Sequence, residues 1–348
     1  MRTIIAMLLL ITIAGGVPVS AADFASQRQT SVRVQDRQPT HIISYRNARQ
    51  SGEQSDMEEE DTSAADDQQV AGRYGQNRPE LVQFNNGSLR LYGALWKPAG
   101  RGPFPAVIYN HGSDPKPNIG ATSRGGYGNI GRFYSQHGFV CLIPLRRGHT
   151  FRQGPRTLCT SDGVMFDSQR AQQANADQLT HDRQWMQMQM ADNEDVVAAV
   201  SWIKTQPFVD PNRLVMSGIS FGGIQTLLAA SKGLGVKGFV PFAPGAMSWR
   251  AVPGLHEVEA WAIQRSPAPV FLIQASNDYN TGPSQYLGPY VDAKGPPSRH
   301  KLYPAFHPEL GPKAGHGGFA TSPEGIDIWS SEVLSFIDQV INRRGAGR

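Results

Sequence analysis

Short apolar runs alternate with segments of helical period over residues 80–341. Runs such as 214–216 and 270–274 have the length and the continuous apolar character of buried central strands. Segments such as 192–204 and 325–341 have the composition and spacing of helices. Strands that alternate with helices predict an α/β fold, with a mostly parallel, doubly wound sheet and helices on both of its faces. The same pattern predicts further strands at 106–110, 139–145, 236–241 and 301–303 and helices near 131–136 and 224–230.

The predicted domain opens with a hairpin. Two runs of alternating apolar residues within 81–98 flank Asn86-Gly87. This dipeptide between two such runs indicates a two-residue turn of type I′. We therefore expect Asn86 and Gly87 to form the turn.

Residues 1–75 differ in character from the rest of the chain. Residues 1–22 combine one positive charge, an apolar core of about ten residues and small residues at their end, which is the pattern of a cleaved signal peptide. This core is shorter than the roughly 20 residues that span a membrane. We therefore expect an exported protein, periplasmic or secreted, with no stable membrane anchor after cleavage. Residues 23–75 are polar, with an acidic run at 53–67, and predict a disordered linker, with an amphipathic propeptide as the alternative. A folded domain is expected over 76–344.

Charge and cysteine content argue against several kinds of site. The formal net charge is +4, and the basic residues are scattered rather than gathered with aromatic residues, which argues against a nucleic-acid partner. The sequence has no H-E-x-x-H motif and no carboxylate cluster, so neither a metal nor another cofactor is expected. The two cysteines leave two alternatives open: a buried free thiol at Cys141, or a disulfide between Cys141 and Cys159.

Candidate chemistry begins at Ser220. It lies in Gly218-Ile-Ser-Phe-Gly222, a G-x-S-x-G motif between the predicted strand 214–216 and the predicted helix 224–230. In a nucleophile elbow this turn is so tight that the serine hydroxyl is exposed on strained backbone. The two glycines are needed because a Cβ there would collide with the neighbouring strand or helix. The motif by itself also fits an ordinary glycine-rich turn, but the strand before it and the helix after it favour the elbow.

An acid and a base follow Ser220 along the chain. Asp278 comes just after the predicted strand 270–274, and His316 comes after the predicted strand 301–303. A serine hydroxyl becomes an effective nucleophile when an imidazole takes its proton. A carboxylate then orients the imidazole and stabilises its charged form. The order Ser, Asp, His on successive strand ends is that of the α/β-hydrolase triad.

The acid and the base each have an alternative. Asp292 lies well past its strand end, where a solvated loop charge is the simpler interpretation. His307 precedes Pro308, which biases it toward extended backbone. By contrast, glycines on both sides let His316 present its ring from a tight loop. We therefore expect Asp278 as the acid and His316 as the base.

Two backbone N–H groups are predicted to form an oxyanion hole, the site that stabilises the negatively charged oxygen of a tetrahedral intermediate. The elbow supplies the N–H of Phe221, and the loop after the predicted strand 106–110 supplies the second donor. That loop reads His111-Gly-Ser113, and the Ser113 N–H is our first choice.

Two insertions follow predicted strand ends, where α/β sheets place their ligand sites. The insertion at 148–191 is rich in Gln and Met, and the insertion at 244–267 contains Trp249 and Trp261. Both alternatives stay open for these side chains: they line a substrate pocket, or they belong to the core.

Over residues 80–341 the chain resembles α/β-hydrolases of the dienelactone hydrolase-like and prolyl oligopeptidase-like groups. The matching stretches are Gly-Pro-Phe-Pro-Ala-Val-Ile-Tyr-Asn-His-Gly112, Arg-Arg-Gly-His149, the segment 210–223 around the elbow, and Gly-His-Gly-Gly-Phe319. The resemblance implies the α/β-hydrolase fold and hydrolysis of an ester or a related acyl bond. It also implies that Ser220, Asp278 and His316 are the catalytic triad.

The chain departs from both groups in one respect each. Dienelactone hydrolases carry a cysteine at the elbow, so Ser220 shifts the expectation toward a carboxylesterase. Oligopeptidases carry a large N-terminal propeller domain, for which residues 23–80 are too few and too polar.

The sequence therefore predicts an exported serine hydrolase that cleaves a small-molecule carboxylic ester through an acyl-enzyme intermediate. Two alternatives stay open. One is a peptidase of the prolyl oligopeptidase-like type, and the other is a hydrolase-fold binding protein without turnover. The sequence makes no prediction of oligomeric state.

Overall fold

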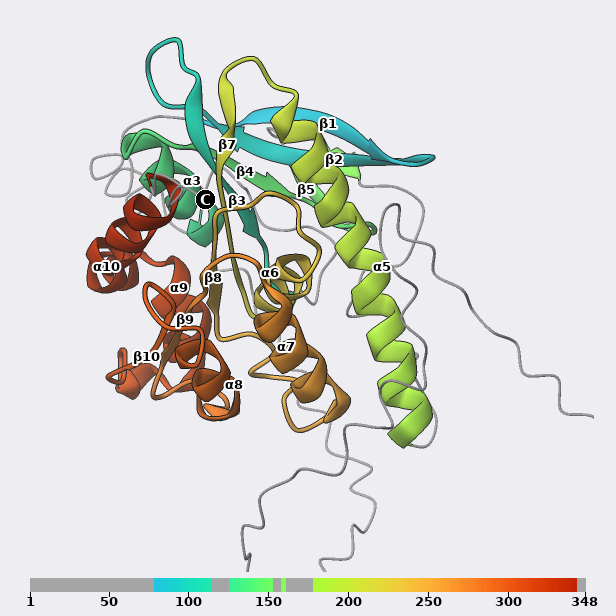
Figure 1. Cartoon of the computed structure of the whole chain (residues 1–348), viewed down its shortest axis with the longest axis vertical. Helices are drawn as coiled ribbons and strands as arrows, with labels where there is room; N and C mark the ends of the chain where they lie inside the picture. The colour runs from blue at the N-terminus through green and yellow to red at the C-terminus, as the bar shows by residue number, and fades with distance from the viewer. Residues whose placement is uncertain (1–77, 114–124, 153–157, 161–177, 343–348) are drawn as a thin grey trace, which may run out of the picture. The chain divides into compact units, whose positions relative to one another are not determined.

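The computed structural model describes residues 78–113, 125–152, 158–160 and 178–342 (Figure 1). These residues all belong to one compact unit of the chain, Glu59–Arg348. The predicted signal peptide at 1–22 and the predicted linker at 23–75 lie outside the described residues.

An eight-stranded sheet forms the centre of the described domain, in the order β1-β2-β4-β3-β7-β8-β9-β10. β2 pairs antiparallel with β1 and with β4, and the other neighbouring strands pair in parallel. The sheet is therefore mostly parallel, as the alternating pattern predicted. Its parallel strands end at a common edge, where open α/β sheets carry their ligand sites. The strands are β1 (Glu80–Asn86), β2 (Leu89–Trp96), β3 (Phe104–Asn110), β4 (Val140–Pro144), β7 (Val209–Ile219), β8 (Gly238–Phe242), β9 (Phe271–Ala275) and β10 (Arg299–Tyr303).

The β1–β2 hairpin is present, but its turn differs from the predicted one. Asn86 pairs with Leu89, so Gly87 and Ser88 form the turn. Positive φ occurs at Gly87 (58°) and not at Ser88, which fits a type II′ turn, where the first turn residue alone needs positive φ. The prediction of a type I′ turn at Asn86-Gly87 is wrong because Asn86 stays in the strand. Its side-chain amide donates to Asp195 Oδ1 at 2.8 Å, which fixes it there.

Helices cover both faces of the sheet, as predicted. Buried residues of α3 and α10 pack on one face, and those of α5, α6, α7 and α8 pack on the other. Within the part of the chain that the structure describes, no helix has the length and apolar character needed to cross a bilayer. The helices are α3 (Gly125–Gln136), α5 (Gln178–Lys204), α6 (Phe221–Ala230), α7 (Gly254–Arg265), α8 (Gly282–Asp292), α9 (Phe319–Thr321) and α10 (Pro323–Ile341), with short turns η2 (Pro308–Leu310) and η3 (Ala314–Gly318).

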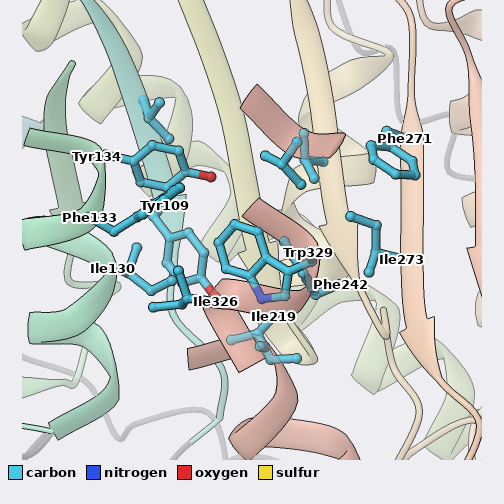
Figure 2. Packing of buried hydrophobic residues seen from close by; sticks show 14 of the residues in the cluster. Tyr109, Ile130, Phe133, Tyr134, Ile219, Phe242, Phe271, Ile273, Ile326 and Trp329 are labelled. Atoms are coloured by element: carbon cyan, nitrogen blue, oxygen red, sulfur yellow. The ribbon is translucent and has the colours of Figure 1, made fainter. Parts of the chain in front are cut away.

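The central strand β7 is buried on both faces over its second half, residues 214–219. Val215 packs in the cluster beneath α3 and α10, whereas its neighbour Met216 packs in the cluster beneath α5 to α8. Figure 2 shows part of the first cluster, where the Trp329 ring of α10 meets Phe133 and Phe242 with ring centroids 5.4 Å and 5.0 Å away. A strand buried on both faces needs apolar residues at successive positions, which is why β7 was recognisable as a continuous apolar run.

The first insertion contains more regular structure than the sequence indicated. β5 (Thr150–Arg152) and β6 (Leu158–Thr160) form a two-stranded antiparallel sheet. α5 begins at Gln178, 14 residues before the predicted helix 192–204, and therefore takes in the Gln- and Met-rich part of the insertion. Gln and Met are good helix formers, but this part lacks a regular apolar stripe, so periodicity did not reveal it.

Cys141 lies within β4 as a free, fully buried thiol. Burial raises the pKa of this thiol well above its usual value, because the thiolate would lose its hydration. The structure therefore agrees with the free thiol, the first of the two alternatives for the cysteines. A thiol in this environment is inert rather than nucleophilic.

Candidate active site

Ser220 forms the link between a strand and a helix. β7 ends one residue before it, and α6 begins one residue after it. Ser220 has φ 57° and ψ −118°, a backbone conformation that residues with a Cβ rarely adopt. Its N–H donates to Phe242 O at 3.0 Å, and its C=O accepts from Gly245 N at 3.2 Å. The structure therefore contains the predicted elbow, held in place by the end of β8.

The glycines of the elbow allow backbone to approach backbone. A Cβ on Gly218 would lie 2.5 Å from Gly222 O, and a Cβ on Gly222 would lie 2.0 Å from Asn110 O at the end of β3. Both separations are far below van der Waals contact, and the opposing atoms belong to backbone that cannot rotate away. The G-x-S-x-G pattern is therefore required by the packing of α6 against β3.

Replacing Gly222 with alanine is expected to lower the free energy of unfolding by about 3 kcal/mol or more, toward the upper end of overpacking effects because the clash is with backbone. Urea denaturation followed by circular dichroism measures the effect. Gly317→Ala is the matched control, since a Cβ on Gly317 meets nothing within 4 Å. We expect that control to change the stability by less than about 0.5 kcal/mol. Equal stability of the two variants would contradict the proposed backbone contact.

Asp278 and His316 are in contact, as the predicted acid–base pair requires. Asp278 lies in the turn after β9, and the tight loop expected around His316 is the π-helical turn η3. The Nδ1 atom of His316 is 2.8 Å from Oδ1 of Asp278, but the ring N–H is poorly aligned with this oxygen. Catalytic hydrogen bonds are often poorly aligned before substrate binds. The Nε2 atom of His316 is buried and has no hydrogen-bond partner among the described residues.

Asp278 is held by a buried network that sequence reasoning missed. Its side chain is 0% exposed. Its Oδ1 accepts from Tyr279 N at 2.6 Å, and its Oδ2 accepts from Gln274 Nε2 at 3.0 Å. Gln274 is itself fixed, because it also donates to Asn280 O at 2.8 Å and accepts from Ser284 N at 3.2 Å. One signal was available: Gln274 is a polar residue at the end of an otherwise apolar strand.

Asn277 joins the turn of the acid to the segment that carries the base. Its Oδ1 accepts from Phe306 N and its Nδ2 donates to Phe306 O, both at 2.8 Å. A Cβ on Gly315 would lie 2.4 Å from Asn277 Oδ1, so the backbone next to His316 passes directly against this side chain. These contacts fix the position of the segment that carries His316 relative to the turn that carries Asp278.

The alternative acid and base lie in other pairs. His307 has a 45% exposed side chain, and its Nδ1 is 2.9 Å from Glu309 Oε1. Its backbone is left-handed (φ 44°, ψ 60°) rather than extended as expected. Asp292, at the end of α8, lies 2.8 Å from Nδ1 of His300. Over the described ranges, no three His, Cys, Asp or Glu side chains are arranged to hold a metal ion.

The loop after β3 passes close to the nucleophile. A Cβ on Gly112 would lie 3.7 Å from the Cβ of Ser220. The N–H of Gly112 is already used, because it donates to Tyr127 Oη at 2.8 Å. The next amide in the loop is that of Ser113, which is the predicted second oxyanion donor. The first predicted donor, the N–H of Phe221, belongs to the first turn of α6, where amides have no partner within the helix.

The two insertions differ in their relation to this site. Trp185 of α5 lies against Phe221, with ring centroids 5.9 Å apart, so the first insertion reaches the elbow. In the second insertion, Trp249 is buried and stacks on His256 at 3.8 Å, which favours the core alternative for this side chain. An aromatic residue that the sequence did not single out, Tyr279, is 43% exposed and lies edge-on to His316.

Comparisons with known proteins agree with this architecture. The family model of the prolyl oligopeptidase family matches residues 161–236, which include the elbow. The structure of esterase Est22 superposes with a TM-score of 0.54 at 15% sequence identity, covering 80% of this chain and 85% of that one. The chain has the α/β-hydrolase fold. At so low an identity, the likeness extends to the fold alone.

Two further structures share the α/β-hydrolase fold. An esterase of Pyrococcus furiosus superposes with a TM-score of 0.51 at 15% identity, covering 76% of this chain and 91% of the esterase. The acylaminoacyl peptidase of Pyrococcus horikoshii superposes with a TM-score of 0.51 at 14% identity, covering 81% of this chain and 45% of the peptidase. The chain thus spans less than half the length of that peptidase. Together with the match of residues 161–236 to the prolyl oligopeptidase family, these structures support a hydrolase of the α/β-hydrolase type.

Proposed function

We propose that the protein is a serine hydrolase that cleaves a carboxylic ester, or a related acyl bond, through an acyl-enzyme intermediate. The observation that carries this proposal is the 2.8 Å contact between His316 Nδ1 and Asp278 Oδ1, with Nε2 of the same ring buried and unpaired within the described residues. A histidine held in this way has one nitrogen oriented by a carboxylate and the other available for a serine proton. Ser220 lies at the same edge of the sheet, on the elbow.

In this proposal Ser220 Oγ attacks the ester carbonyl carbon while His316 Nε2 takes the hydroxyl proton. The carbonyl oxygen becomes an oxyanion that accepts hydrogen bonds from the N–H groups of Phe221 and Ser113. The intermediate collapses to an acyl-Ser220 ester, and His316 gives the proton to the departing alcohol. Water then attacks the acyl group with the same proton transfers, which releases the acid and restores the serine.

Esters are the substrates that we favour, because the elbow carries a serine and not the cysteine of dienelactone hydrolases. The second candidate function is peptide hydrolysis. It is supported by the match of residues 161–236 to the prolyl oligopeptidase family and by the likeness to an acylaminoacyl peptidase. The signal-like pattern of residues 1–22 adds export to the proposal.

The mature protein is expected to hydrolyse p-nitrophenyl esters of graded acyl length and to react with a fluorophosphonate probe. Trypsin cleaves after Arg213 and Lys232, so the probe should be found by mass spectrometry on the peptide 214–232. A folded protein that is neither labelled nor active would contradict the proposal and favour a binding protein. If the serine is labelled but a peptide anilide is cleaved with a higher kcat/KM than the best ester, the peptidase is the correct alternative.

A further inference from the structure

We propose that Arg146 is the positioning residue of the oxyanion hole. Its guanidinium fixes the direction in which the Ser113 N–H points. The ring of Phe221, the residue that supplies the other predicted donor, packs against the same guanidinium. This inference rests on the proposed function, because an oxyanion hole acts in acyl transfer. The sequence assigned no role to Arg146, which appeared there only among the scattered basic residues and in the matching stretch Arg-Arg-Gly-His149.

Arg146 is a buried cation between the two halves of the hole. It lies just after β4 and is 1% exposed. Its Nη1 donates to His111 O at 2.6 Å, and its Nη2 donates to Gly112 O at 3.1 Å. On its other side, the guanidinium carbon lies 4.4 Å from the centre of the Phe221 ring. One side chain therefore contacts both the loop after β3 and the residue that follows the nucleophile.

The contact with Gly112 O determines where the Ser113 N–H points. The C=O of Gly112 and the N–H of Ser113 belong to one planar trans peptide, in which the two groups point in opposite directions. Gly112 O accepts from Arg146 Nη2 at 3.1 Å and is 2.7 Å from His111 Nδ1. Two donors on this oxygen keep the carbonyl directed toward Arg146. The Ser113 N–H is consequently directed away from Arg146.

The preceding peptide is held in the same way. Its carbonyl, His111 O, accepts from Arg146, and its amide, the Gly112 N–H, donates to Tyr127 Oη. The backbone N–H of Arg146 donates to Nε2 of His111 at 3.3 Å. Because Nε2 accepts this bond, the proton of a neutral His111 ring is on Nδ1, which donates to Gly112 O. Rotation of either peptide would break hydrogen bonds at both of its ends.

The geometry favours arginine over lysine at this position. A guanidinium presents several N–H donors in a fixed plane and stacks on an aromatic ring, so it can serve two successive carbonyls and Phe221 together. An ammonium group is a compact charge on a flexible stem and lacks this planar fork. Arg146→Lys should therefore keep the buried charge but lose part of the alignment.

The neighbouring arginine provides a matched control. Arg147 points to α5, where its Nη2 and Nε donate to the two carboxylate oxygens of Asp195 at 2.7 Å and 2.9 Å. Its backbone N–H also donates to Asp195. Arg147→Gln removes a partly buried arginine from the same turn of the chain without removing a hydrogen bond to the loop after β3. We expect it to lower thermal stability and to leave kcat within twofold of the wild type.

The first measurement is steady-state hydrolysis of a p-nitrophenyl ester by full-length Arg146→Gln and Arg146→Lys. We expect kcat to fall about 100-fold in the glutamine variant and about tenfold in the lysine variant, because small misplacements of oxyanion donors cost this much. KM should change by less than about threefold, since the hole acts on the transition state. Inhibition by a boronic acid, which forms a tetrahedral adduct on serine, should weaken in parallel with kcat. A stability role alone would leave kcat of the folded enzyme unchanged.

The second measurement is hydrogen exchange at the amide of Gly112, which donates to Tyr127 Oη, and it needs no enzymatic activity. Arg146→Gln should speed exchange at least tenfold, and Arg147→Gln should leave it unchanged. An inactive wild type would refute the proposed function, while the exchange data would still decide whether Arg146 holds the loop. The proposal is overturned if folded Arg146→Gln keeps kcat within twofold of the wild type, or keeps its exchange rates. If the glutamine variant does not fold, wild-type kcat in Arg146→Lys overturns it.

Discussion

Ser220→Ala is expected to lower kcat for a p-nitrophenyl ester about a millionfold, which is the typical effect of removing the nucleophile from a Ser-His-Asp unit. The physical reason is that the acyl-enzyme cannot form, so that water must attack the substrate directly with help only from binding and the oxyanion donors. The same substitution should abolish fluorophosphonate labelling of the peptide 214–232. This peptide also contains Ser217 and Ser231, so loss of labelling in the variant identifies Ser220 as the reactive residue.

Stability measurements show whether Ser220→Ala loses activity for a chemical reason. Alanine keeps a Cβ in the strained backbone at φ 57°, so its free energy of unfolding should stay close to that of the wild type. Ser220→Gly should be about 1 kcal/mol more stable than Ser220→Ala, because glycine relieves strain worth about 1–3 kcal/mol and loses some of the gain to chain entropy. Labelling of either folded variant on 214–232 would refute the assignment of Ser220.

The fold was predictable because its central strands are buried on both faces and alternate with helices along the chain. β7 shows this most clearly: in its buried part, residues 214–219, successive residues such as Val215 and Met216 contact opposite helix layers, so the run 214–216 is apolar without a break. The elbow was predictable for a related reason. Backbone contacts at Gly218 and Gly222 leave no room for a side chain, so only glycine fits at these two positions and the motif is visible in the sequence.

Other features depend on contacts between residues far apart in the chain, and local patterns do not report them. The hairpin turn lies one residue later than predicted because Asn86 is tied to Asp195 on α5. The extended start of α5 was missed because its Gln- and Met-rich sequence has no regular apolar stripe. The residues that hold the candidate site in place also depend on contacts that are distant in the chain. Gln274 and Arg146 act through hydrogen bonds to backbone or carboxylate groups that no short motif contains.

His316→Ala is expected to lower kcat for the same ester about a millionfold, because in a triad the loss of the base costs as much as the loss of the nucleophile. Without the imidazole, the Ser220 hydroxyl keeps its proton and the departing alcohol receives none. The rate of fluorophosphonate labelling should fall together with kcat, since that reaction also uses the activated oxygen of Ser220. Ester hydrolysis and the rate of labelling, measured on variants shown to be folded by circular dichroism, test both expectations.

His307→Ala is the control that makes this result specific. His307 follows the same strand and was the alternative base, but its side chain is 45% exposed and pairs with Glu309. We expect this variant to keep kcat within twofold of the wild type, because an exposed pair of this kind contributes little to the position of Asp278 or His316. The opposite pattern, with activity retained by His316→Ala and lost by His307→Ala, would move the base to His307. Such a result would require the segment 304–311 to rearrange, since Asp278 contacts His316 and not His307.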